Sequence, residues 1–298
     1  MIEASAINNE ISYDFDDAVR ATAELGIRWI DIARVGDPWV TDLSGGQIAG
    51  MRRTLRAAGL RVGSIDGPAG RRTLFGAAAR RQEDRDLRRS IELAQTFEAP
   101  YVRVFSPEFS EPPRSQPRPD LEVHLHEIVD VLRPWAEAAA AAGVTLTVET
   151  EGVTYTGSCA EMRRVVDAVG HPALAVLWDV TNSWRLEGAH PAGYQHIRGL
   201  VRRLHLKGGR LAPDDPNRIL ETVPLADGNV LYGQLLADLV ADGFSGCAAV
   251  QTHLYSRDPE KWTKLRAATI AGLRYLQALL DEVQAPKTSP AAAAAAAR

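Results

Sequence analysis

Short apolar runs alternate along the chain with longer segments in which apolar residues recur at helical spacing. The short runs predict buried strands at residues 2–7, 28–33, 60–66, 100–105, 144–149, 173–179, 201–206 and 246–251. The longer segments predict helices at residues 15–25, 44–58, 82–97, 120–142, 158–169, 191–199, 230–242 and 259–284. Eight strand–helix units in about 250–300 residues predict an α/β fold, namely a single (β/α)8 TIM barrel.

Residues that are typical of helix ends lie at the boundaries of the predicted helices. Ser158 precedes a predicted helix and Glu161 follows three residues later, which is the spacing of a capping box. Four glycines each follow a helical segment and precede a strand, where a left-handed cap is expected: Gly26, Gly59, Gly143 and Gly243. A doubly wound open sheet is the alternative fold. It predicts a glycine-rich turn after the first strand, and ASAINNEISY contains no glycine.

The barrel pattern accounts for residues 1–284, which we expect to form one catalytic domain. Residues 285–298 (APKTSPAAAAAAAR) are rich in proline and alanine and offer nothing to pack, so we expect a disordered tail. Residues 106–119 (SPEFSEPPRSQPRP) are proline-rich and cannot continue as a helix. They predict a long loop after the fourth strand, on the face where barrel active sites lie.

Composition excludes several classes of protein. No stretch approaches 18 apolar residues, so no membrane span is predicted, and the first residues lack the order of a signal peptide. The only two cysteines, Cys159 and Cys247, cannot form a disulfide framework and fit a reducing compartment, so we expect a cytoplasmic protein. The formal net charge of −4 argues against a nucleic-acid-binding protein.

Four adjacent strands each end in a polar residue that can bind a metal: Glu149, Asp179, His205 and Gln251. Because side chains two apart share a strand face and strand ends build the barrel mouth, these four can point to a common position. Carboxylate, imidazole and amide donors suit a divalent cation such as Mn²⁺, Mg²⁺ or Co²⁺. The alternative is that the acids cap helices and that His205 is a hydrogen-bonded structural residue.

The blocks that carry these residues resemble one known family. They are AVRATAELGIRWIDI, LTVETEG, LAVLWDVTNSW, RRLHLKGG and PLADGNVLYGQLLADLVADGFSGCAAVQTH, and they span about residues 15 to 280. Their order and spacing resemble the xylose isomerase-like TIM barrel family of sugar phosphate isomerases and epimerases. That family holds a divalent metal with Glu, Asp, His and Glu from the fifth to eighth strands. Glu149, Asp179 and His205 match this set, and Gln251 stands where the second glutamate is usual.

The resemblance implies a divalent-metal-dependent sugar isomerase or epimerase that abstracts a proton next to a carbonyl of a polyhydroxylated substrate. Glu149 is then the candidate general base. Mn²⁺ is the expected ion, with Mg²⁺, Co²⁺ and Zn²⁺ as alternatives. The expected partner is a small sugar-like molecule, and a homo-oligomer or a partner subunit is compatible with the sequence. Family members that cut abasic DNA are disfavoured here by the acidic composition.

Gln251 changes this expectation, because an amide can bind a cation but cannot accept a proton near neutral pH. It argues against two symmetric glutamate bases and for a lyase of the same family, such as a dehydratase or an enzyme that cleaves C-glycosides of 3-keto sugars. It also removes one negative charge from the ligand set, which predicts weaker retention of the metal. A partner-dependent or non-catalytic subunit is the remaining alternative.

Other residues are candidates for substrate contact. His253 follows Gln251 by two positions and shares its face if the strand continues. In an isomerase, His253, Glu151 or a water would supply the second proton transfer. Trp184, on the predicted loop after the sixth strand, is expected to stack on a sugar face. The other candidates for binding substrate hydroxyls or oxyanions are Asn182, Lys207, Glu151 and Asp66.

Overall fold

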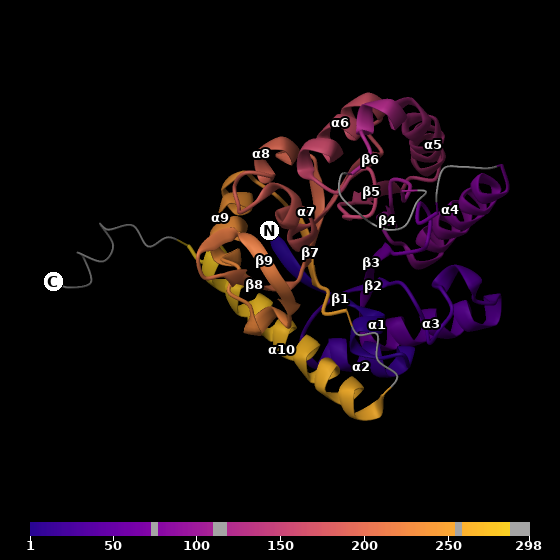
Figure 1. Cartoon of the computed structure of the whole chain (residues 1–298). Coiled ribbons are helices and arrows are strands. Elements are labelled where there is room, and N and C mark those ends of the chain that lie inside the picture. Colours follow the sequence, from indigo (N-terminus) through magenta and orange to yellow (C-terminus); the bar gives the residue numbers. More distant parts are fainter. Residues whose placement is uncertain (73–76, 110–117, 254–257, 287–298) are drawn as a thin grey trace.

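The computed structural model describes residues 1–72, 77–109, 118–253 and 258–286. Within them, eight parallel strands close into a barrel in the order β1-β10-β7-β6-β5-β4-β3-β2 (Figure 1). The strands are β1 (Ile2–Ile7), β2 (Trp29–Ile32), β3 (Arg61–Ile65), β4 (Tyr101–Val104), β5 (Thr145–Glu149), β6 (Leu174–Asp179), β7 (Val201–Leu206) and β10 (Gly246–Val250). All eight predicted strands are present, and the predicted (β/α)8 barrel is confirmed.

Helices surround the strands (Figure 1). Those that follow the prediction are α2 (Phe15–Glu24), α3 (Gly45–Ala58), α4 (Ala77–Phe97), α5 (Leu121–Ala141), α6 (Cys159–Val169), α8 (Tyr194–Ile197), α9 (Tyr232–Ala241) and α10 (Pro259–Gln284). Helix α4 begins before the predicted residue 82, and α8 is shorter than the predicted 191–199. In the part of the chain that the structure describes, none of the helices combines the length and the apolar character that crossing a membrane requires.

The predicted helix ends are confirmed in their backbone geometry. Gly26, Gly59, Gly143 and Gly243 all have φ between 69° and 76°, the left-handed region that glycine adopts at least cost. The Ser158 side chain accepts a hydrogen bond from the Glu161 backbone N–H, and the Glu161 carboxylate accepts one from the Ser158 N–H, which completes the capping box. These caps fix where each helix turns back toward the next strand.

Several elements were not predicted. Helix α7 (Val180–Glu187) follows β6 directly, so Trp184 lies on a helix and the predicted loop is wrong there. Strands β8 (Gly208–Ala212) and β9 (Asp215–Val223) form an antiparallel hairpin after β7. The other additions are α1 (Asn8–Ile11) and two 3₁₀ turns, η1 (Val40–Asp42) and η2 (Leu225–Asp227).

Two predicted segments lie wholly or partly outside the described residues. The proline-rich segment at 106–119 does so at residues 110–117, and the predicted tail at 285–298 does so from residue 287. The division into a domain at 1–284 and a tail therefore stays a prediction.

The interior of the barrel is charged, although branched apolar side chains dominate most TIM barrels. Arg103 on β4 and Arg203 on β7 are 5% and 1% exposed. Asp31, Asp66 and His205 are fully buried beside them. A buried charge is tolerated only when it is paired and hydrogen-bonded. We therefore expect these buried side chains to form ion pairs and hydrogen bonds with one another.

Candidate metal and substrate site

The ends of four neighbouring strands bring the predicted metal ligands to the same mouth of the barrel. Asp179 on β6 lies in register with His205 on β7, and Glu149 ends β5 next to β6. One ligand atom from each of Glu149, Asp179 and His205 lies within 4.8 Å of the others. All three residues are buried, with exposed fractions of 0–2%. The structure thus brings three of the four predicted ligands to within reach of one ion.

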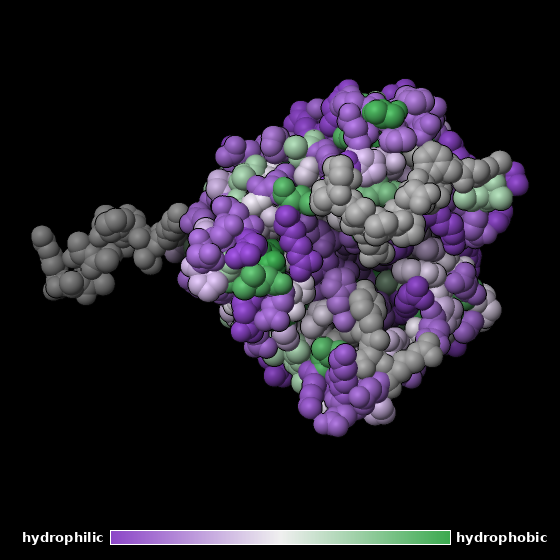
Figure 2. Space-filling model, in the orientation of Figure 1, coloured by the Kyte–Doolittle hydropathy of each residue, from purple (hydrophilic) through white to green (hydrophobic). Residues whose placement is uncertain are grey.

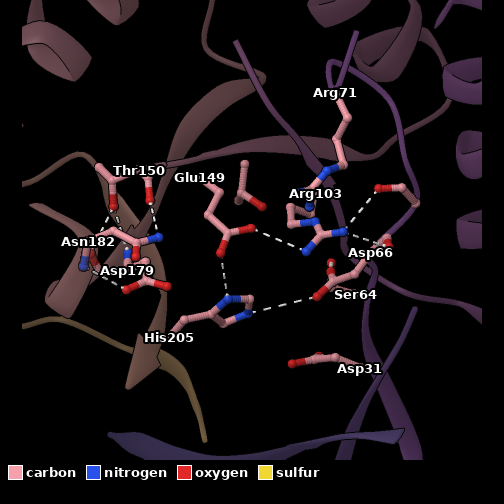
Figure 3. A network of polar contacts seen from close by, with 12 residues as sticks. Asp31, Ser64, Asp66, Arg71, Arg103, Glu149, Thr150, Asp179, Asn182 and His205 are labelled. Atoms are coloured by element: carbon pink, nitrogen blue, oxygen red, sulfur yellow. Dashed lines mark hydrogen bonds and ion pairs between the residues drawn. The ribbon is translucent and has the colours of Figure 1, made fainter. Parts of the chain in front are cut away.

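Glu149 uses its two oxygens on different partners (Figure 3). Its Oε1 lies 3.0 Å from His205 Nδ1, and its Oε2 accepts a hydrogen bond from Arg103 Nη1 at 3.2 Å. Burial raises the pKa of Glu149, but the nearby His205 and Arg103 outweigh burial and hold that pKa well below its usual range. Glu149 is therefore a carboxylate near neutral pH.

Asp179 both caps a helix and faces the site. Its Oδ1 accepts a hydrogen bond from the Asn182 backbone N–H at 3.1 Å, which caps α7. Its Oδ2 lies 2.6 Å from Lys207 Nζ, and Lys207 also donates to Asn182 Oδ1 at 3.1 Å. Burial raises the pKa of Asp179, and the Lys207 ammonium opposes that effect. Asp179 therefore caps a helix, as the alternative interpretation expected. Its second oxygen, Oδ2, remains directed at the Lys207 ammonium.

Gln251 follows β10 and extends its ladder, since the Gln251 N–H donates to the Leu206 carbonyl at 2.9 Å. The Gln251 side chain is nearly buried, and Oε1 has no hydrogen-bond partner among the described residues. A buried amide oxygen without a partner costs free energy, so this atom is free to bind a ligand. It is the amide donor that the sequence predicted at this mouth.

His253 lies where the strand has already ended. Its φ of 60° is left-handed and β10 ends at Val250, so the strand does not continue to His253 and the condition for sharing a strand face with Gln251 is not met. Burial, with the neighbouring Lys207 acting in the same direction, lowers the pKa of His253 to about 3. Its imidazole is therefore neutral near pH 7.

A cavity of about 80 Å³ opens beside these residues. Figure 2 shows a hollow near the middle of this face, lined largely by hydrophilic residues. Glu149, Gln251 and His253 line the cavity together with Glu151 and Asp66. Burial raises the pKa of Glu151, with Lys207 opposing the rise. The cavity therefore brings together five of the residues that the sequence singled out as candidates for the site.

Trp184 was expected to stack on a sugar face, but its side chain is buried next to strand β9 instead. It is 6% exposed, and its indole N–H donates to the Pro216 carbonyl of β9 at 3.1 Å. This contact ties α7 to the hairpin. Trp39, by contrast, lines the cavity, and the Arg34 guanidinium lies 3.8 Å from the centre of its ring.

Sequence reasoning missed several residues at the cavity. Arg103 could have been found, because it is a charged residue in the middle of the apolar strand YVRV. Its guanidinium also donates to the Asp66 and Gly67 carbonyls at 2.9 and 3.1 Å, so it joins β4 to the loop after β3. The other residues come from the short helix α1 and from segments that follow strands, and none of them carries a recognisable signal: Asn9, Glu10, Arg34, Trp39, Arg71 and Phe105.

A second group, Asp31, Asp66 and His205, has the spacing of a metal site. The Arg203 guanidinium already forms ion pairs with both carboxylates, at 3.3 Å from Asp66 Oδ1 and closer still to Asp31 Oδ2. A buried cation therefore neutralises this group. In the first group, no single cation of the described residues bridges the two carboxylates: Glu149 pairs with Arg103, and Asp179 pairs with Lys207.

The residues at the mouth fit a divalent ion. Glu149 and Asp179 supply oxygens, His205 supplies a ring nitrogen, and the unpartnered Oε1 of Gln251 supplies a neutral oxygen. Mixed oxygen and imidazole donors suit Mn²⁺, Mg²⁺, Co²⁺ and Zn²⁺.

Comparison with known proteins agrees with the fold. Residues 19–278 match the model of the xylose isomerase-like TIM barrel family, so the chain is a TIM barrel of that family and belongs to it. No curated protein matches the chain significantly.

Solved structures share the fold at low sequence identity. A xylose isomerase-like TIM barrel protein from Mycobacterium smegmatis, in complex with magnesium, is 20% identical with a TM-score of 0.69, covering 94% of this chain and 98% of that one. D-psicose 3-epimerase from Clostridium cellulolyticum H10, solved with D-tagatose, is 15% identical with a TM-score of 0.73, covering 94% and 99%. A probable 3-DHS dehydratase from Bacillus anthracis is 16% identical with a TM-score of 0.71, covering 93% and 99%.

Proposed function

We propose that this protein is a divalent-metal-dependent enzyme that removes a proton next to a carbonyl group of a sugar-like, polyhydroxylated substrate, leading to isomerisation or epimerisation. The observation that carries the proposal is the buried trio Glu149, Asp179 and His205, with ligand atoms within 4.8 Å, beside a cavity lined by further acid–base groups. A D-psicose 3-epimerase and a probable 3-DHS dehydratase are among the structures that share this fold, which supports an enzyme of this general kind.

The proposed metal ligands are Glu149, Asp179, His205 and Gln251, with Mn²⁺ as the first candidate and Mg²⁺, Co²⁺ or Zn²⁺ as alternatives. When bound, the ion would polarise the substrate carbonyl and stabilise the negative charge that develops on its oxygen. Arg103 holds Glu149 Oε2 at 3.2 Å, which fixes the carboxylate in one orientation.

Glu149 is the proposed base, and His253 is the proposed second proton carrier. Glu151 lines the same cavity and could take that second role instead. The neutral imidazole of His253 can accept or donate a proton through its two ring nitrogens, as a shuttle requires. A proton returned to the opposite face of the carbon gives the epimer.

Substrate hydroxyls would be bound by Asn182, Lys207, Glu151 and Asp66. Lys207 and Asn182 are hydrogen-bonded to each other, which presents an ammonium and an amide as one unit. Because Trp184 is buried under the hairpin, Trp39 is the aromatic ring that we propose to contact the substrate.

A lyase is the second candidate, and Gln251 favours it. Elimination needs one base to remove the proton and an acid to assist the leaving group, and it does not need matched bases on both faces. The amide at position 251 meets that asymmetric requirement. A non-catalytic or partner-dependent subunit is the third candidate, and it would hold no stoichiometric ion.

The test incubates metal-reconstituted protein in D₂O with a panel of ketoses, aldoses and 3-keto glycosides. Mass spectrometry and NMR of the separated products follow deuterium at carbons next to the carbonyl. Deuterium incorporation with conversion to an isomer supports the epimerase, and incorporation with loss of a leaving group supports the lyase. Glu149→Gln should abolish exchange in either case. Exchange that survives in Glu149→Gln, or no exchange with any member of the panel, would contradict the proposal.

A further inference from the structure

His205 lies between two carboxylates that come from different strands (Figure 3). Its Nδ1 is 3.0 Å from Glu149 Oε1, and its Nε2 is 3.8 Å from Asp66 Oδ2. The histidine and Asp66 are both fully buried. Among the described residues, neither Nε2 nor Asp66 Oδ2 has a hydrogen-bond partner. Asp66 Oδ2 is thus within ion-pair distance of Nε2, and one oxygen of Asp31 also lies within 4.8 Å of a ring nitrogen of His205.

Other contacts hold Asp66 in this orientation. Ser64 Oγ donates a hydrogen bond to Asp66 Oδ1 at 2.6 Å, and Arg203 Nη1 donates to the same oxygen at 3.3 Å. Arg203 is itself fixed by its ion pair with Asp31. Because Oδ1 is engaged twice, Oδ2 remains to face the imidazole.

A neutral imidazole carries its hydrogen on one ring nitrogen and a lone pair on the other. A carboxylate beside Nε2 favours hydrogen on Nε2, and the lone pair then lies on Nδ1, the nitrogen that faces Glu149. The Asp66 carboxylate thus selects the tautomer and the ring orientation that a metal ligand needs.

We propose that Asp66 is a positioning residue that prepares His205 to bind the divalent ion through Nδ1, with Ser64 and Arg203 holding Asp66 in place. This inference rests on the proposed function, because it assumes that His205 is a metal ligand. This positioning role is additional to the substrate contact proposed above for Asp66.

The competing explanation is that Asp66 only balances the charge of Arg203. Asp31 offers a matched control, because it pairs with the same guanidinium and is equally buried. Asp31→Asn and Asp66→Asn make the same isosteric change and remove one carboxylate from Arg203 in each case. They differ in that Asp66 faces His205 Nε2.

The experiment measures the Mn²⁺ affinity of the full chain by the electron paramagnetic resonance signal of free Mn²⁺. We expect Asp66→Asn to weaken binding about 10–100-fold, the usual cost of losing a partner of a metal-bound histidine. Asp31→Asn should stay much closer to the wild-type affinity, with the melting temperatures of both variants recorded for comparison. Equal losses in the two variants, or no loss in Asp66→Asn, would overturn the inference and leave the proposed function standing. A wild-type chain that binds no Mn²⁺ would contradict both.

A second variant keeps the inference testable if Asp66→Asn does not fold. Ser64→Ala removes one hydrogen bond from Asp66 Oδ1 and leaves the carboxylate in place. We expect it to weaken Mn²⁺ binding about fivefold, as the loss of one ordinary hydrogen bond predicts. Wild-type affinity in Ser64→Ala would then count against the positioning role. In Mg²⁺-loaded wild-type protein, ¹⁵N spectra should show hydrogen on Nε2 of His205, and hydrogen on Nδ1 would overturn the inference directly.

Discussion

Lys207 Nζ lies 2.6 Å from Asp179 Oδ2, and the two side chains are 4% and 0% exposed. This buried pair joins the ends of β6 and β7 at the proposed metal site. Removing one partner of such a pair leaves the other charge buried and unpaired, which typically lowers the free energy of unfolding by about 3–5 kcal/mol. A metal ion at the same carboxylate would compensate the unpaired charge.

Lys207→Met should therefore lower the melting temperature of the metal-free chain, and Mn²⁺ should restore part of the loss. The stabilisation by Mn²⁺ should be larger in Lys207→Met than in the wild type, since the ammonium no longer competes for Asp179. Thermal unfolding with and without Mn²⁺ measures both quantities. Equal shifts in the two proteins would show that Asp179 does not meet the ion.

Gln251→Glu restores the glutamate that the family resemblance implies at this position. The change adds a negative charge to the ligand set, and a unit charge at about 4 Å contributes about 4 kcal/mol at an effective dielectric constant of 20. We expect at least about tenfold tighter retention of the metal, measured as metal content after dialysis against a chelator. Wild-type protein that keeps a full equivalent of metal, with no change in Gln251→Glu, would contradict the charge argument.

The Asp238–His190 contact predicts a pH dependence of stability outside the site. His190 Nε2 lies 2.8 Å from Asp238 Oδ2, and this hydrogen bond lowers the pKa of Asp238 in the folded chain. The folded state therefore binds the Asp238 proton more weakly than the unfolded state does. Its stabilisation is present above the unfolded pKa of about 3.9 and is lost as the pH falls through the folded pKa. Melting temperatures measured from about pH 6 down to about pH 3 should fall less steeply in Asp238→Asn than in the wild type. Parallel curves would refute this assignment.

The two thiols should be unreactive in the folded chain. Burial, reinforced by the nearby Glu187 carboxylate, raises the pKa of Cys159 well above its usual value. Burial, with Asp31 acting in the same direction, raises the pKa of Cys247 to about 12. The thiolate is the reactive form, so labelling with a disulfide reagent at pH 8 should be slow in the native protein and complete in urea. Fast native labelling of either cysteine would be inconsistent with these environments.

The eight barrel strands could be predicted because each is a short apolar run, and Gly26, Gly59, Gly143 and Gly243 mark the helix ends before four of them. Helix α7 was missed because VTNSWRLE has no clear apolar stripe and begins directly at the end of β6. The hairpin of β8 and β9 was missed for a different reason. Much of β9 is exposed, and its residues DPNRILETV lack the alternation that a half-buried strand shows.

The predicted ligands could be found because strand ends converge in a barrel, which is a property of the fold. The network around them could not, since Arg203 on β7 reaches Asp66, which follows β3, across the barrel, and Arg103 reaches the Asp66 carbonyl from β4. No local pattern encodes which interior acid pairs with which interior arginine. The loop residues Trp39 and Arg71 reach the cavity by loop geometry that a single sequence does not reveal.

The central claim is that Glu149, Asp179, His205 and Gln251 hold one divalent ion at the barrel mouth. Anomalous diffraction at the manganese absorption edge, from crystals of the full chain grown with Mn²⁺, tests it most directly. We expect one strong peak, bounded by the two carboxylates, the His205 Nδ1 and the Gln251 Oε1. A peak placed elsewhere, or no peak at this position in crystals saturated with Mn²⁺, would contradict it.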